Sequence, residues 1–495
     1  MKDFKKTISF LKTAVFAAAI FVFCLSRMLT ANGQQTKLIL SLDECVKFAA
    51  RNSFEVKLAK LDLYIEETDL MYSEAVFDTF LYGGAAYEED KSRQLSILAP
   101  NDNQTNEYYL RLEKTLPTGT ELCLEAKDTR RWSNSAYVLK NPSHETKITF
   151  EAVQPIAKNS FGFVDRTEIS ITELTVKNAG LETKDRIEAL MAKVQTYYWE
   201  LVSAKRSLEI YEEMLKKAEN LFESDKKNLD MGLIEKGELF ASEANVAKLK
   251  SERVVEENAY RRAQENLKMI MNMNEDIILF PREALNYDSL NKDLTDCLKQ
   301  AFSGRMDYKI KKREIEIKGL NLKIKDNQQW PEIDLNATLA LNGIDSGLDR
   351  AVDKASALSN TYYYGGIEFK VPLENKEARS EYVKAGHEKE KALVSFKELE
   401  RIIITDVGNA FRDVKSFEAG IGFITEAVDL QSKKLEEEEK RFYQARSGTK
   451  RLIDYQQDLL GAKLEEALFL FKHKKAKVEL DRVMNAIFTK YEDVL

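Results

Sequence analysis

The residues that most often carry enzyme chemistry are sparse in this sequence of 495 residues. Its three histidines, His144, His387 and His473, stand far apart, and no nucleophile lies beside a base in a familiar motif. We find no phosphate-binding loop and no metal-ligand spacing. Charge is abundant instead, since 32% of the residues are Asp, Glu, Lys or Arg. The sequence therefore favours ionic contacts over bond-making chemistry, and it indicates no enzyme, cofactor or metal.

Two segments place charged residues shortly after a glycine. Gly232 is followed six residues later by Glu238, and Gly448 is followed six residues later by Asp454. Asp458 comes four residues after Asp454, so on a helix these two carboxylates share a face. Such segments can form ion pairs or line an acidic surface, and the elements that position them decide which.

Composition limits the class of protein. The charge is too high for a polytopic helical membrane protein, and 7 prolines and 20 glycines are too few for a disordered chain. Beyond the N-terminus, no segment reaches the 18 consecutive apolar residues of a spanning helix. Any membrane insertion must therefore use strands.

Residues 1–33 resemble a secretory signal peptide. Four lysines precede the apolar run 13–25, and the small residues 31–33 offer a cleavage site. An uncleaved anchor is an alternative, whereas lipidation at Cys24 is disfavoured by the bulky Phe23 before it. Cleavage removes five basic residues and one acidic residue, which changes the formal net charge from −7 to −11. An exported chain this acidic is not expected to bind nucleic acid.

The chain contains an internal duplication with an offset of 252 residues. Residues 42–47 align with residues 294–299, which makes Cys45 and Cys297 equivalent. Together with Cys123 they form an odd set, so we expect small buried residues and no disulfide framework. We assign residues 34–280 to the first repeat and residues 281–495 to the second, each beginning with a helix.

Each repeat then shows the period-two alternation of strands, at about 78–154 and 332–371. Four strand candidates lie in the first repeat and two in the second. Alternating apolar residues with tyrosines at one end suit an outer-membrane barrel, and a soluble antiparallel sheet fits equally well. Residues 91–105, 129–145 and 343–360 are expected to be polar surface loops.

Each repeat ends in long helices at about 165–273 and 376–490. No proline lies between Pro155 and Pro281 or after Pro372, and apolar residues recur at helical spacing. A break at each glycine predicts an antiparallel coiled-coil hairpin. We expect the charged run 435–441 to be a solvated helix face, with a groove for a partner as an alternative. Met269, Met271 and Met273 are expected to pack within the first hairpin.

These features together resemble the TolC family of outer-membrane efflux proteins over residues 38–490. The likeness lies in the repeated order of helix, strands and hairpin, in the junctions at Pro155 and Pro372, and in the two glycine-to-acid segments. It implies an α+β membrane protein. Three copies would share one outer-membrane β-barrel, continued through the periplasm by an α-helical barrel of coiled-coil hairpins.

The resemblance also implies a passive exit duct that docks with a periplasmic adaptor and an inner-membrane pump. Family members supply four strands per chain, so the extra pair near 106–127 either enlarges the barrel or forms a separate hairpin. A periplasmic coiled-coil adaptor or scaffold is the alternative, although the alternating strands do not suit it.

The resemblance further assigns roles at the hairpin tips. Gly232 and Gly448 would form the tip turns. Glu238 and Lys450 match positions of a closing pair that holds the tips shut, with Arg451 as a substitute for Lys450. Asp454 matches one position of an acidic ring at the pore entrance. The second position of that ring is Gln457 here, and the nearby Asp458 is a candidate to replace it.

Overall fold

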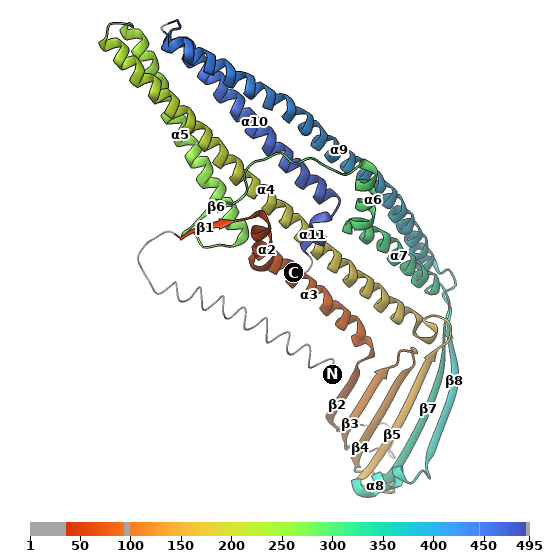
Figure 1. The fold of residues 1–495 in the computed structure, drawn as a ribbon. Coiled ribbons are helices and arrows are strands. Elements are labelled where there is room, and N and C mark those ends of the chain that lie inside the picture. Colours follow the sequence, from red (N-terminus) through yellow and green to blue (C-terminus); the bar gives the residue numbers. More distant parts are fainter. Residues whose placement is uncertain (1–35, 94–99, 445, 492–495) are drawn as a thin grey trace, which may run out of the picture. The chain divides into compact units, whose positions relative to one another are not determined.

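The computed structural model describes residues 36–93, 100–444 and 446–491, so the expected signal peptide and Cys24 lie outside the described residues. Helices and strands alternate in blocks along the chain (Figure 1). In order, the elements are β1 (Thr36–Leu40), α2 (Leu42–Asn52), α3 (Phe54–Glu74), β2 (Thr79–Asp90), β3 (Asn103–Thr115), β4 (Glu121–Ser133), β5 (Ser143–Pro155), α4 (Phe163–Asp230), α5 (Lys236–Met271), β6 (Ile277–Pro281), α6 (Leu294–Gly304), α7 (Met306–Asn327), β7 (Glu332–Asp345), α8 (Leu348–Ser356), β8 (Thr361–Lys370), α9 (Lys376–Tyr443), α10 (Thr449–Val483) and α11 (Ala486–Tyr491).

Six strands form one antiparallel sheet in the order β2-β3-β4-β5-β7-β8. Figure 1 shows these strands side by side, with β2 and β8 at the two edges. The extra pair of strands in the first repeat is β3 and β4, and it lies inside the sheet between β2 and β5. Of the two arrangements that the sequence allowed for this pair, the chain therefore forms the one within the main sheet and not the separate hairpin.

The expected loops are shorter than predicted. Strand pairing continues to Ser133 in β4 and starts again at Ser143 in β5, so much of the expected loop 129–145 is strand. The expected loop 343–360 contains the end of β7 and the unpredicted helix α8. Polar residues continue these ladders because backbone hydrogen bonds, and not apolar side chains, extend the strands.

The two repeats use elements of matching length. The helices α2 and α6 each have 11 residues and start at Leu42 and Leu294, which are 252 positions apart. The long helices α4 and α9 each have 68 residues. Cys45 and Cys297 are both buried, and burial raises the pKa of Cys45 to about 12 and that of Cys297 above its usual value. Both thiols are therefore poor nucleophiles at neutral pH.

The chain divides into two compact units, and each contains parts of both repeats. The tip unit comprises residues 36–49, 194–287 and 423–471, and the sheet unit comprises residues 50–193, 288–422 and 472–491. In the sheet unit, Cys297 of α6 joins an apolar core with residues of α9 and α10, including Val407 and Leu480. In the tip unit, apolar residues are buried along the hairpin helices, among them Met214, Ala218, Leu221, Leu249, Leu267, Leu435, Leu452 and Leu459.

The methionines at the end of α5 behave differently from one another. Met271 is fully buried, whereas Met269 is 70% exposed, so the predicted packing of Met269 is wrong. Residues two positions apart on an α-helix point about 200° away from each other, so Met269 and Met271 cannot share one buried face.

Candidate functional site at the hairpin tips

The first tip turn depends on Gly232. This glycine follows α4 with φ +71°, a left-handed conformation that side-chain-bearing residues rarely adopt. The Gly232 N–H donates to the Leu229 carbonyl at 2.9 Å, and the Leu233 N–H donates to the Asn228 carbonyl at 2.8 Å. This is the Schellman arrangement, which satisfies the last carbonyls of a helix. The turn then leads into α5, near whose start Glu238 lies.

The second tip turn brings Gly448 close to the first hairpin. A Cβ atom built on Gly448 would lie 3.3 Å from Oε1 of Glu238. That spacing is tighter than most side-chain contacts, so a glycine at this position permits the close approach. Glu238 and the second tip are therefore neighbours within this chain.

The basic residues of the second tip, Lys450 and Arg451, do not contact Glu238 in an ion pair within the described part of this chain. Lys450 is exposed. Arg451 Nη1 lies 3.8 Å from Oε1 of Glu438, so Arg451 faces a carboxylate of its own hairpin. Any pairing between Glu238 and Lys450 therefore stays a prediction for the assembled protein.

The two aspartates of the expected acidic ring differ in their surroundings. Asp454 and Asp458 are both exposed on α10. Asp458 forms an ion pair with Lys434 Nζ at 2.7 Å, which offsets its charge. Gln457, at the position where a second acid was implied, donates to the Asn245 side chain at 3.3 Å. The structure thus leaves Asp454 as the stronger candidate for an acidic surface.

A buried polar contact joins the two hairpins and was not predicted. The Thr449 hydroxyl of α10 donates to Oδ1 of Asp225 on α4 at 3.0 Å, and both residues are fully buried. Burial raises the pKa of the Asp225 carboxyl, while hydrogen bonds from Ser242 and Thr449 act in the opposite direction. Unpaired buried carboxylates are costly, so this Asp225–Thr449 contact favours one arrangement of the two hairpins.

The sequence did contain a signal for this contact. Met214, Ala218 and Leu221 are buried at spacings of four and three residues, and Asp225 continues that stripe four residues later. An acidic residue on the apolar stripe of a coiled-coil helix requires a buried partner.

Glu438 repeats the same pattern in the second hairpin. It is 2% exposed and lies three residues after the buried Leu435, so the prediction that 435–441 is a solvated face is wrong for these two positions. The Ser447 hydroxyl donates to Glu438 across the turn. The remaining acidic residues of the run, Glu436, Glu437 and Glu439, are exposed or half-buried as expected.

The sheet has two chemically different faces. Because directly paired residues share a face, the register defines an apolar face and a polar face. One row of the apolar face consists of Leu81, Leu112, Leu124, Phe150, Leu339 and Tyr363. The next row, on the polar face, consists of Tyr82, Arg111, Glu125, Thr149, Ala340 and Tyr362. Much of the apolar face is exposed, including Leu81, Leu110, Tyr363, Ile367 and Phe369, each more than half exposed.

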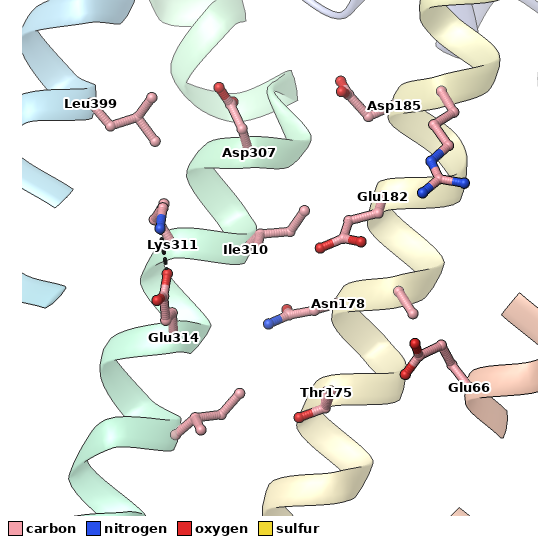
Figure 2. A pocket seen from close by; sticks show the side chains of 13 residues that line it. Glu66, Thr175, Asn178, Glu182, Asp185, Asp307, Ile310, Lys311, Glu314 and Leu399 are labelled. Carbon is pink, nitrogen blue, oxygen red and sulfur yellow. Dashed lines mark hydrogen bonds and ion pairs between the residues drawn. The ribbon is translucent and has the colours of Figure 1, made fainter. Parts of the chain in front are cut away.

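The sheet unit also contains an acidic groove of about 690 Å³ between its helices. Figure 2 shows Glu182 and Asp185 of α4 facing Asp307 and Ile310 of α7 across it. Burial and the neighbouring charge of Asp307 raise the pKa of the Asp185 carboxyl. Its lining combines five carboxylates with two basic side chains, Arg186 and Lys311.

Within the described residues, neither the long hairpin helices nor any shorter helix is apolar enough over a sufficient length to cross a bilayer. No cluster of three or more His, Cys, Asp or Glu residues suited to a metal ion occurs within those same residues.

Solved structures with the same arrangement decide the fold. The chain superposes on the outer-membrane channel CmeC of Campylobacter jejuni with a TM-score of 0.66 and 13% identity, covering 92% of this chain and 89% of CmeC. This chain has the fold of TolC-family outer-membrane channels. The outer-membrane protein VceC of Vibrio cholerae superposes with a TM-score of 0.65 and 14% identity, covering 90% of this chain and 96% of VceC. The open state of the MtrE channel of Neisseria gonorrhoeae superposes with a TM-score of 0.65 and 12% identity, covering 90% of this chain and 88% of MtrE.

Support for this TolC-like fold comes from structures, because the sequence comparisons found no match. No model of a protein family matches the chain, and no curated protein matches it either. At 12–14% identity the superpositions establish the architecture, and the activity has to be argued from the residues.

Proposed function

We propose that this protein is an outer-membrane exit duct of a tripartite efflux or type I secretion system. It would conduct substrates passively from the periplasm and an inner-membrane pump to the outside, without making or breaking bonds. The observation that carries the proposal is a channel fold over nine-tenths of the chain, combined with a sheet whose exposed face is apolar. No cofactor is needed for such a duct.

The two faces of the sheet support a place in the outer membrane. Lipid tolerates exposed apolar side chains but no unpaired backbone groups, so a membrane sheet must close on itself. Within the described chain, β2 and β8 each lack a strand partner on their outer edge, because they stand at the two ends of the strand order. A homotrimer, as the TolC-like fold implies, would supply those partners.

The tips of the hairpins are the proposed gate. Three copies would gather their tips at the periplasmic entrance, where a periplasmic adaptor and the pump would dock. The Asp225–Thr449 contact would hold the two hairpins of each chain together in the closed state. Glu238 and Lys450 would add a closing charge pair across the hairpin tips, with Arg451 as the alternative partner of Glu238.

Charge exchange tests that pair. K450E places two carboxylates together and should raise the channel's open probability in planar bilayers. The double variant E238K/K450E restores opposite charges and should return the open probability toward wild type. An unchanged open probability in K450E would remove the proposed pair from the gate, and the Asp225–Thr449 contact would then carry the closing alone.

An acidic entrance is the second proposed property of the tips. Three copies of the exposed Asp454 would form a ring that favours cations, as carboxylate rings do in other pores. Asp458 would contribute less to this ring because Lys434 offsets its charge.

The alternative is a periplasmic coiled-coil adaptor or scaffold that never enters the membrane. It would explain the hairpins, but not an apolar sheet face left exposed over six strands. Washing membranes with alkaline sodium carbonate separates the two. A duct stays with the outer-membrane fraction, whereas recovery of the protein in the wash would favour the scaffold.

A further inference from the structure

The edges of the sheet carry the next inference. β2 has 12 residues and β8 has 10, and their long outer edges end the six-stranded order. Soluble proteins protect such edges with lysines, prolines or bulges. β2 contains no Lys, Arg or Pro, and its acidic residues occupy only its last three positions, 88–90. In β8, the charged residues are Glu368 and Lys370, both near its end. These edges are therefore suited to pairing with another strand.

The directions of the two edge strands suit another copy of this chain as the partner. All five pairings in the sheet are antiparallel, so β2 and β8, as the first and sixth strands, run in opposite directions. If β8 pairs with β2 of a neighbouring copy, the ladder continues without a change of pattern. The apolar and polar faces also continue, provided that odd-numbered residues of β8 lie opposite odd-numbered residues of β2.

We propose that all six strands enter the barrel wall, so that three copies enclose eighteen strands joined by three β8–β2 seams. The number of copies rests on the trimer proposed above, while the six strands and their edges rest on the sheet itself. With strands about 4.8 Å apart and tilted by about 40°, eighteen strands give a backbone radius of about 18 Å. Twelve strands would give about 12 Å, so the wall encloses about twice the cross-section.

The native thiol of Cys123 offers a labelling site with which the barrel wall can be tested. Cys123 lies on the polar face of β4, next to Arg111, whose Nε donates to the Cys123 sulfur at 3.3 Å. The neighbouring Leu124 lies on the apolar face and is 46% exposed. Cys45 and Cys297 are buried with raised pKa values, so they should not compete for a thiol reagent.

The first experiment labels these positions in isolated outer membranes with a cationic, membrane-impermeant methanethiosulfonate. Wild-type Cys123 should react because the lumen is aqueous, and C123S supplies the blank. L124C in the C123S background should react at least tenfold more slowly because lipid covers it. Both sites should react alike after solubilisation in urea. Equal labelling rates in intact membranes would place water on both faces of β4 and overturn the six-strand wall.

The second experiment tests the seam. In the C123S background, A85C on the apolar face of β2 is combined with a cysteine at each odd position of β8 from 361 to 369. At least one combination should give disulfide-linked chains under oxidation, ending in a band of three chains. A86C, on the polar face, is the matched control and should not link to the same β8 positions. No linkage at any odd position, or a ladder that ends at a number other than three, would refute the seams.

Failure of the eighteen-stranded wall can be distinguished from failure of the proposed duct function. A protein that conducts ions but shows equal labelling and no seam would be a duct with fewer strands in its wall. A protein with protected Leu124 and three-chain bands but no ion current would have the eighteen-stranded wall without being a duct.

Discussion

The Asp225–Thr449 contact gives the most direct prediction about gating. T449V keeps the size of the side chain but removes the hydroxyl that donates to the buried carboxylate at 3.0 Å. A hydrogen bond to a charged group contributes about 1.5–3 kcal/mol, and its loss leaves Asp225 buried with one partner fewer. If opening separates the two hairpins, the closed state of each chain loses that stabilisation. The closed-to-open ratio should therefore fall by about 10- to 100-fold per chain.

The assay is the open probability of single channels in planar bilayers at a fixed voltage. T425V is the matched control, because the Thr425 hydroxyl also donates to a carboxylate, Glu466, at 3.0 Å. That bond is exposed and lies within the second hairpin, so T425V should leave the open probability unchanged.

A substitution at the other end of the contact should act in the opposite direction. Burial raises the pKa of Asp225, which means that the closed arrangement disfavours the charged carboxylate. D225N keeps an acceptor for Thr449 without that charge, so it should lower the open probability. Wild-type open probability in both T449V and D225N, with helix content unchanged by circular dichroism, would refute this account of the closed state.

Three further predictions concern stability, pH and selectivity. G232A should destabilise the first hairpin by about 1 kcal/mol, because the turn needs φ +71°, whereas G237A on the open face of α5 should not. Glu188 of α4 is buried, and its carboxylate accepts hydrogen bonds from the backbone N–H groups of Ile487 and Phe488. Burial raises its pKa to about 7 from 4.5, so the native state binds the extra proton and wild-type stability falls between these pH values as the pH rises. The stability of E188Q relative to wild type should therefore rise by about 3 kcal/mol across that window. D454N should reduce cation selectivity more than D458N, whose carboxylate already pairs with a lysine.

Each of these three predictions can be contradicted by a specific measurement. Equal thermal midpoints for G232A and G237A would contradict the role of the turn. Parallel stability curves for E188Q and wild type from pH 4.5 to 7 would contradict the raised pKa. Reversal potentials in a salt gradient measure selectivity, and an equal shift in D454N and D458N would contradict the unequal exposure of their charges.

The sequence predicted the repeated elements well because their signals are local. The 252-residue offset placed Cys45 opposite Cys297, and both are buried at matching positions of α2 and α6. The sequence predicted a candidate for each of the six strands of the main sheet, but not β1 or β6, which pair with each other in a second sheet. Period-two alternation could not show whether β3 and β4 belong to the main sheet, since the same alternation suits a separate hairpin. That choice depends on which strands pair over long sequence distances.

The contacts at the tips were missed for a related reason. Asp225 and Thr449 are 224 positions apart, and Glu438 meets Ser447 only because the chain turns between them. A charged residue in a helix is usually solvated, so composition favoured exposure. The helix α8 was missed because a segment of 9 residues is too short to establish a helical period.

Single-channel recording on the purified, detergent-extracted protein tests the central claim most directly. We predict discrete, long-lived ion-current steps after insertion into a planar bilayer, from a species that migrates as a heat-modifiable trimer. Insertion without current, or failure of the trimer to insert at all, would contradict the assignment of this chain as an outer-membrane exit duct.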